Sequence, residues 1–237
     1  MLRGMVFVDH QNFNIALQTY YRNKGWPCPK LDYEVLFKKI TGLVDNVDYI
    51  KASMYIPKPD DFLMGDASLA NAYNWATNLS TKPFLDVIEG RFISRPTKTK
   101  REMDITDKST YYKVEKGTDI NLAADVVSKA FHNSYDVAFI LSADTDYLKI
   151  YDILRNLGKL TVVVVIKGQN VQKIRPHVDA VLRLGKAFFD KCLMPSTDGA
   201  DAEESTVATT EELEETVELT ADDEEEPSDT ASDAKTE

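Results

Sequence analysis

The chain has 237 residues, of which 43% are hydrophobic, so it is long enough to bury a hydrophobic core. Its formal net charge of −11 is unevenly distributed. Residues 196–237 hold 17 of the 39 acidic residues and one of the 28 Lys and Arg, which leaves −16 on this segment and +5 on residues 1–195. A mildly basic body suits a polyanionic partner, and the acidic segment would compete with that partner.

The composition changes near residue 196. Beyond it Thr, Ser, Glu, Asp and Ala dominate, so the segment buries too little apolar surface to offset its ordering entropy. We therefore predict one folded domain over residues 1–195 and a disordered acidic tail over residues 196–237. The tail would act as a docking arm for a protein partner, as an autoinhibitory arm, or as an inert solubilising segment.

The cysteines and the short apolar runs bear on cellular location. Cys28 and Cys192 have neither metal-ligand nor redox spacing, which favours a reduced, cytosolic setting. The apolar run before Asp9 is too short for a signal peptide or a membrane span, and no later run reaches spanning length. We expect a cytoplasmic protein without a membrane partner.

Apolar runs alternate with segments that have helical spacing. Strands are predicted over residues 5–8, 48–56, 84–93, 136–141, 160–166 and 180–184. Helices are predicted after Asp32 and over residues 13–21, 67–79, 118–131, 147–157 and 186–191. Continuous Val, Ile and Phe runs are typical of strands buried on both faces, so we predict an α/β fold with a parallel sheet flanked by helices.

Some local features are predicted in more detail. Asn12 and Asp32 are each placed to cap the following helix. Residues 57–61 should break the second strand, and residues 96–116 should form a hairpin or a mobile loop. The helix after Thr118 should bury one apolar stripe, made of Ile120, Ala123, Val127, Ala130 and Phe131.

Four acidic residues fall at the boundaries of predicted elements. Asp9 ends the first strand, Asp119 opens the long helix, and Asp144 and Asp146 follow the strand 136–141. In a parallel sheet all four would lie on one rim, at the carboxyl ends of the strands where ligands bind. Clustered carboxylates are hard oxygen ligands that suit Mg²⁺ or Mn²⁺, ions that polarise phosphodiesters and activate water.

Three of these acids have a simpler interpretation, whereas Asp9 gains nothing from a helix dipole at the end of a strand unless it acts as a cap. Asp119 and the pair Asp144 and Asp146 also fit the start of a helix, where carboxylates are favoured by the free N–H groups. Asn12 would either cap its helix or orient Asp9. Asp125 lies about 120° around the helix from Asp119, so we expect it to support the site from outside the metal ligands or to lie on the surface.

Three segments stand out, in chain order VFVDHQNF (6–13), KGTDINLAAD (116–125) and LSADTDYLKIYDILRNLGKLTVVV (141–164). Together they resemble the motifs of NYN domains in the LabA/DUF88 group of PIN-like nucleases. The resemblance implies a Rossmann-like parallel sheet, dependence on Mg²⁺ or Mn²⁺, and ribonuclease activity. It also implies catalytic and metal-binding roles, with Asn12 in support, for Asp9, Asp119, Asp144 and Asp146.

The chain departs from the family pattern at three positions. His10 stands where a small residue is common, Ala143 where Gly is common, and Tyr147 where Phe is common. We expect a peripheral role for His10 rather than contact with a scissile phosphate.

The polar segment 95–116 is a candidate for nucleic-acid binding. It contains seven Lys and Arg against four acids, beside a pair of tyrosines. Basic side chains would follow a phosphate backbone and a tyrosine would stack on a base. The candidates are Lys100, Arg101, Tyr111, Tyr112, Lys113 and Lys116. The alternative is a solvated hairpin with two half-buried tyrosines.

The leading hypothesis is therefore a metal-dependent endoribonuclease, whose products by analogy with PIN-like enzymes carry a 5′-phosphate and a 3′-hydroxyl. The alternative is a non-catalytic or weakly catalytic RNA-binding or regulatory protein of the LabA type. A third hypothesis is a nuclease that acts on DNA or flapped structures. Homo-oligomerisation and a protein partner for the acidic tail are compatible with each.

Overall fold

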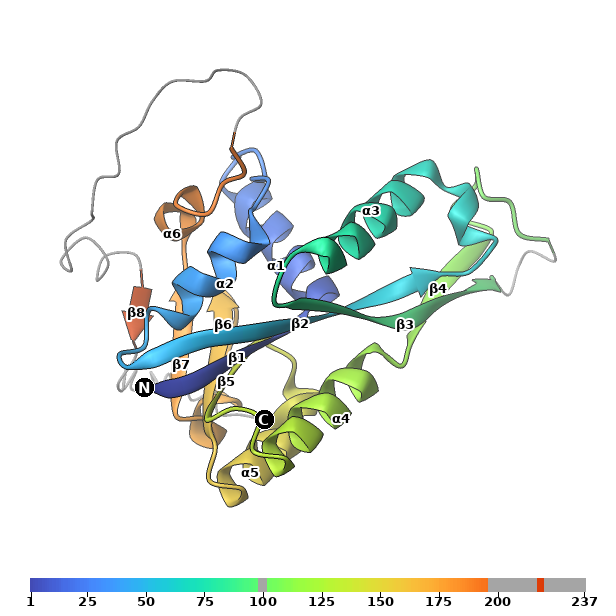
Figure 1. Cartoon of the computed structure of the whole chain (residues 1–237). Helices are drawn as coiled ribbons and strands as arrows, with labels where there is room; N and C mark the ends of the chain where they lie inside the picture. The colour runs from blue at the N-terminus through green and yellow to red at the C-terminus, as the bar shows by residue number, and fades with distance from the viewer. Residues whose placement is uncertain (98–101, 196–216, 220–237) are drawn as a thin grey trace, which may run out of the picture.

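A computed structural model describes residues 1–97, 102–195 and 217–219 (Figure 1). The strands form one sheet and are β1 (Leu2–Asp9), β2 (Val47–Pro59), β3 (Leu85–Pro96), β4 (Tyr111–Lys116), β5 (Val137–Leu141), β6 (Leu160–Ile166), β7 (Ala180–Leu184) and β8 (Val217–Leu219). The α-helices are α1 (His10–Asn23), α2 (Tyr33–Thr41), α3 (Ala67–Asn78), α4 (Thr118–Phe131), α5 (Leu148–Asn156) and α6 (Lys186–Asp190). Short 3₁₀ helices are η1 (Leu63–Gly65), η2 (Leu79–Thr81), η3 (Thr145–Tyr147) and η4 (Arg175–His177).

The predicted α/β fold with a parallel sheet is confirmed. The strand order is β4-β3-β2-β1-β5-β6-β7-β8. Neighbours from β3 to β7 pair in parallel, while β4 and β8 pair antiparallel at the two edges. The chain extends the sheet from β1 through β2 and β3 on one side, and through β5, β6 and β7 on the other. The boundary between β1 and β5 is therefore the topological switch point of the sheet.

Helices cover both faces of the sheet, which explains the continuous apolar runs of the strands. Val6 and Val8 of β1 belong to the core under α1, α2 and α6, while Met5 and Phe7 belong to the core under α4 and α5. Figure 1 shows these two groups of helices on opposite sides of the sheet. Because side chains alternate between faces along a strand, a doubly covered strand must be apolar at successive positions.

Helix α1 begins earlier than predicted, and its cap is Asp9 rather than Asn12. Asp9 has extended backbone angles, and its Oδ1 atom accepts a hydrogen bond from the backbone N–H of Asn12 at 3.0 Å. A helix that starts directly after a strand takes its cap from the last strand residue. The cap predicted at Asp32 is confirmed, since its carboxylate accepts from the N–H groups of Glu34 and Val35.

The predicted buried stripe of α4 is wrong in part. Ile120 and Phe131 are 73% and 75% exposed, and the buried apolar positions are Leu122, Val126 and Ala130. Both sets keep helical spacing, so the sequence pattern alone does not select between them. The contact of α4 with β1, β2 and β3 determines the orientation of the helix.

Strand β2 runs through the two prolines that were expected to end it. The N–H of Ala52 points toward β3, where it donates to the carbonyl of Phe84 at 2.8 Å. Because backbone N–H groups alternate in direction along a strand, the nitrogens of Pro57 and Pro59, which carry no hydrogen, face the opposite side. There β1 has already ended, because its last paired residue, Asp9, lies beside Tyr55. The prolines therefore remove no hydrogen bond from the sheet.

The polar segment after β3 forms a hairpin, one of the two predicted alternatives. Strand β3 continues through Gly90, and β4 pairs with it antiparallel. Figure 1 shows this hairpin extending away from the central sheet alongside α3. A separate small core of Leu63, Phe92 and Tyr111 stabilises it.

The predicted acidic tail lies outside the described residues except for β8. This strand pairs with β7, with Leu182 beside Leu219 and Leu184 beside Val217, so a strand occurs where none was predicted. In the described part of the chain, no helix has the length and apolar character needed to cross a membrane.

Gly90 sets the approach of β3 to the start of α4. A Cβ atom at this position would lie 2.7 Å from the backbone nitrogen of Thr118 and 2.9 Å from the carbonyl oxygen of Lys116. We predict that Gly90→Ala destabilises the protein by about 1–3 kcal/mol in urea unfolding, because backbone atoms must move. Gly65→Ala is the matched control, since its nearest neighbour would be Ile105 at 3.5 Å. Equal stability of the two variants would contradict the prediction.

Candidate functional site

Asp9 lies at the switch point of the sheet and is only 5% exposed. Its position follows from the register of β1 and β5, which sets Val8 beside Leu141 at the carboxyl ends of both strands. Besides the N–H of Asn12, the hydroxyl of Ser142 donates to Asp9 Oδ2 at 3.2 Å, and the hydroxyl of Tyr147 lies at 3.4 Å from the same oxygen. Three elements therefore supply donors to one carboxylate.

Asp119 is held against Asp9 by the same tyrosine. Gly117, with φ of 85°, turns the chain from β4 into α4, which leaves Asp119 in the first turn of the helix. The hydroxyl of Tyr147 donates to Asp119 Oδ1 at 2.9 Å. One hydroxyl therefore lies within 3.4 Å of a carboxylate oxygen of Asp9 and of Asp119, which brings the two acids close together.

Asp144 caps a helix and also lies beside Asp9, so it is compatible with both predicted interpretations. Its Oδ1 atom accepts a hydrogen bond from the N–H of Asp146 at 2.9 Å, so it caps η3. Its own N–H donates to Ser142 Oγ at 3.2 Å, which links it to Asp9 through one hydroxyl. Asp146 is exposed, and its described contact with Asp144 is through the backbone.

The two residues predicted to support the acids differ in placement. Asn12 Oδ1 accepts a hydrogen bond from the N–H of Ala143 at 3.3 Å, so it ties α1 to the loop that carries Asp144. Asp125 instead accepts from the hydroxyl of Tyr55 at 2.9 Å and pairs with Lys129 at 2.8 Å. Its described contacts therefore lie outside the group formed around Asp9.

Burial and like charges make the site electrostatically unfavourable without a cation. Burial raises the pKa of Asp9, the N–H of Asn12 opposes this, and the charges of Asp119 and Asp144 raise the pKa further. The ion pairs found among the described residues do not include Asp9, Asp119 or Asp144. A bound cation would relieve this repulsion.

The donor chemistry fits a hard divalent cation, but the placement of the acids is looser than in a formed metal site. Carboxylate oxygens are the ligands that Mg²⁺ and Mn²⁺ prefer. Within residues 1–97, 102–195 and 217–219, no group of three or more His, Cys, Asp or Glu side chains is close enough to hold one ion. The structure brings together Asp9 and Asp119 through Tyr147, with Asp144 adjacent.

Three residues at this site were not identified from the sequence: Ser142, whose hydroxyl donates to Asp9, Glu115 and Tyr147. Burial raises the pKa of Glu115, and the charges of Asp9 and Asp119 add to the effect. Its position two residues before Gly117, at the end of a strand, was the available signal. Burial likewise raises the pKa of Tyr147, so its hydroxyl remains a donor to the two carboxylates. The hydroxyl that distinguishes Tyr147 from the Phe common in the family was the available signal.

The candidate nucleic-acid residues divide into three groups. Tyr111 is 8% exposed and packs edge-on against Phe62 at 5.0 Å, so its ring is part of a core and is not available to stack on a base. Tyr112 is 53% exposed, and Lys113 and Lys116 are also exposed, with Lys113 on the opposite face of β4 from Tyr112 and Lys116. Lys100 and Arg101 lie outside the described residues.

His10 packs among aromatic rings. Its ring lies 6.0 Å from that of Tyr33 and 6.1 Å from that of Trp75. Burial lowers the pKa of His10 to about 4, so the ring is neutral at physiological pH. This placement agrees with the peripheral role expected of it.

We predict that Tyr147→Phe lowers the stability of the metal-free protein by about 1.5–3 kcal/mol, because Asp9 and Asp119 lose a shared donor. Urea unfolding in the presence of a chelator measures this loss. Tyr151→Phe is the matched control, because its buried hydroxyl has no hydrogen-bond partner among the described residues. A loss in both variants, or in neither, would contradict the assignment of the shared hydrogen bond.

The low pKa of His10 predicts a pH dependence of stability. Between pH 6.5 and 4 the unfolded chain binds a proton at this residue that the folded protein does not, so the free energy of unfolding falls as pH decreases. From pH 7.5 to pH 5, wild type should lose roughly 1–2 kcal/mol more than His10→Gln, since Gln does not titrate. Parallel pH profiles of the two proteins in urea unfolding would show that His10 is not buried as a neutral ring.

Comparison with known proteins supports the fold and identifies the family. A solved structure of a protein of unknown function from Vibrio parahaemolyticus is similar, with a TM-score of 0.51 and 15% sequence identity. The similarity covers 81% of this chain and 96% of that one. No curated protein matches the sequence. Residues 3–182 match the NYN domain, a region that includes Asp9, Asp119 and Asp144. The chain therefore belongs to the NYN domain family.

Proposed function

We propose that this NYN domain protein is a metal-dependent ribonuclease of the LabA/DUF88 group and that it hydrolyses RNA phosphodiester bonds. The observation that carries the proposal is the hydroxyl of Tyr147, which lies within 3.4 Å of carboxylate oxygens from both Asp9 and Asp119. Two acids far apart in the sequence thus converge at the switch point of a parallel sheet, where open α/β folds bind their ligands. The family suggests a nuclease.

Asp9, Asp119 and Asp144 would hold Mg²⁺ or Mn²⁺, with Asp146 at the solvent side. The chemistry that such an ion supplies is polarisation of a phosphodiester and activation of water. Ser142 and Asn12 keep Asp9 and the loop after β5 in register through their hydrogen bonds. Tyr147 holds the two facing carboxylates in place.

The charge of the folded region supports RNA as the substrate class. Residues 1–195 carry a net +5, and Tyr112, Lys113 and Lys116 of β4 are exposed, with Lys113 on the same face of the strand as Glu115 of the site. Cations on such a surface would contact phosphates, and the ring of Tyr112 would stack on a base. Competition between single-stranded RNA and DNA separates a ribonuclease from a DNA nuclease.

One observation favours a second candidate, a regulatory RNA-binding protein with little or no catalysis. The described residues contain no group of three potential ligands close enough to hold a metal ion. A protein of this kind would bind RNA equally well with and without a chelator and would cleave it under neither condition.

The test is cleavage of a labelled single-stranded RNA by the full chain with Mn²⁺ or Mg²⁺. We expect Asp9→Asn and Asp144→Asn to reduce cleavage by about 100-fold or more, because each removes a charged ligand. Asp45→Asn is the control, since this exposed residue precedes β2 at the amino end of the sheet. Equal cleavage by wild type and Asp144→Asn would overturn the assignment of the site, and cleavage that survives the chelator would overturn the metal dependence.

A further inference from the structure

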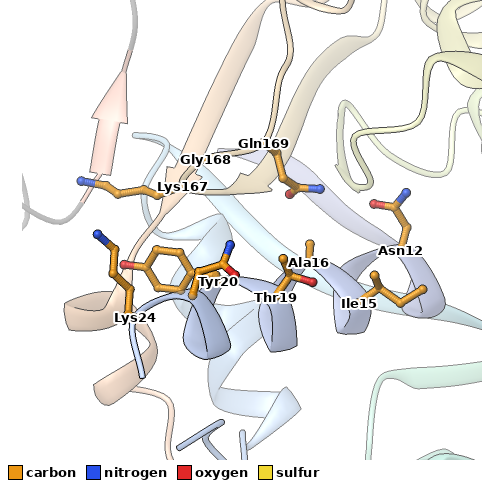
Figure 2. Close-up of a pocket in the computed structure, with 10 residues that line it drawn as sticks. Asn12, Ile15, Ala16, Thr19, Tyr20, Lys24, Lys167, Gly168 and Gln169 are labelled. Atoms are coloured by element: carbon orange, nitrogen blue, oxygen red, sulfur yellow. The ribbon is translucent and has the colours of Figure 1, made fainter. Parts of the chain in front are cut away.

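A groove leads away from the acidic site along α1. Its cavity has a volume of about 640 Å³ and lies between α1 and the loop after β6. Figure 2 shows Asn12 at one end, Lys24 and Lys167 at the other, and Thr19, Tyr20 and Gln169 between them. Gly168, with φ of 96°, turns the chain at the end of β6 so that its two neighbours line the groove.

The groove is continuous with the candidate site through Asn12. This residue lines the groove, and its side chain accepts a hydrogen bond from Ala143, next to Asp144. The backbone N–H of Asn12 also donates to Asp9. A polymer bound at the acids would therefore meet the mouth of the groove directly.

The polar groups along the groove are donors. Gln169 Oε1 accepts from the backbone N–H of Ile166 at 2.8 Å, which fixes the side-chain amide and leaves its NH₂ group as a donor. The hydroxyl of Tyr20 accepts from the N–H of Lys186 at 3.3 Å, so its own hydrogen is free to donate to a ligand. Lys24 and Lys167 lie at the far end, and no Asp or Glu is among the described residues that line the groove.

The floor of the groove is apolar. Ile15 and Ala16 of α1 line it, and Ile15 is 56% exposed. An apolar floor, neutral donors and a cationic end suit a ligand that has anionic groups at intervals and flat apolar faces. Single-stranded nucleic acid has both features.

We propose that this groove binds the part of the RNA strand that extends from the scissile phosphate, with Lys24 and Lys167 as phosphate contacts. The proposal rests on the function proposed above. From Asn12 to Lys24 the helix rises about 18 Å at 1.5 Å per residue. At about 3.4 Å or more per phosphate, the groove accommodates up to about five nucleotides.

The experiment measures binding of fluorescein-labelled 10-nucleotide RNA to the full chain, in chelator, over a range of salt concentrations. Lys24→Gln combined with Lys167→Gln should bind more weakly than wild type, by a factor that grows as salt is lowered. The slope of log K against log salt should become less steep by about 1.4, which corresponds to two lost single-strand phosphate contacts. Affinity of wild type should also rise with RNA length up to about five nucleotides beyond the site.

The matched control is Lys39→Gln combined with Lys82→Gln, which removes the same charge. Both residues are exposed; Lys39 lies near the end of α2 and Lys82 lies just before β3, so both are at the amino end of the sheet. For this control variant, the slope of log K against log salt should equal that of wild type. Thermal unfolding of each variant verifies that the fold is retained.

The outcomes separate the two proposals. If wild type binds and cleaves RNA but both double variants have the same salt slope, the groove assignment is overturned and the ribonuclease proposal stands. If the groove variant alone has the flatter slope but wild type cleaves nothing with any metal, the groove stands and hydrolysis is overturned. If wild type does not bind RNA, both are overturned.

Discussion

The parallel pairing of β1 with β5 is the constraint on which the candidate site depends. Its register places the last paired residues, Val8 and Leu141, side by side, so Asp9 and Ser142 emerge at the same level. From this boundary the sheet grows in opposite directions, and α1 and α5 leave the two strands toward opposite faces. A crevice at the carboxyl ends is therefore a consequence of topology, and later loops only complete it.

Asp9 is a residue of this crevice at which both burial and like charges disfavour the ionised form. A buried carboxylate with two acidic neighbours is costly unless donors or a cation compensate for lost hydration. Its donors come from α1, from the loop after β5 and from η3. The same hydrogen bonds that stabilise the charge thus fix the relative positions of three segments. Without a cation, Asp9 is held by the N–H of Asn12 and the hydroxyls of Ser142 and Tyr147, and the arrangement is looser than a formed metal site.

Helix α1 connects the parts of the molecule that the proposals involve. Its first turn is capped by Asp9, its side chains face the core through Phe13 and Leu17, and its exposed side forms a wall of the groove. On the other side of the site, the β3–β4 hairpin carries Glu115, whose pKa is raised by burial and by the charges of Asp9 and Asp119, and the exposed Lys113 and Lys116 flank it in β4. A strand of RNA between these two surfaces would contact both.

The sequence by itself determined the alternation of strands and helices and the parallel sheet, because burial on both faces requires continuous apolar runs in the strands. It also determined the acids at the rim of the sheet, because each of them closely follows a strand or opens a helix in the sequence. Only the tertiary structure decided which face of α4 is buried, since Ile120 and Leu122 both fit helical spacing. It also decided that Asp9 caps α1, that Tyr111 belongs to a core, and that Tyr147 joins two acids 110 residues apart in the chain. These features depend on contacts between distant segments, and local spacing carries no information about such contacts.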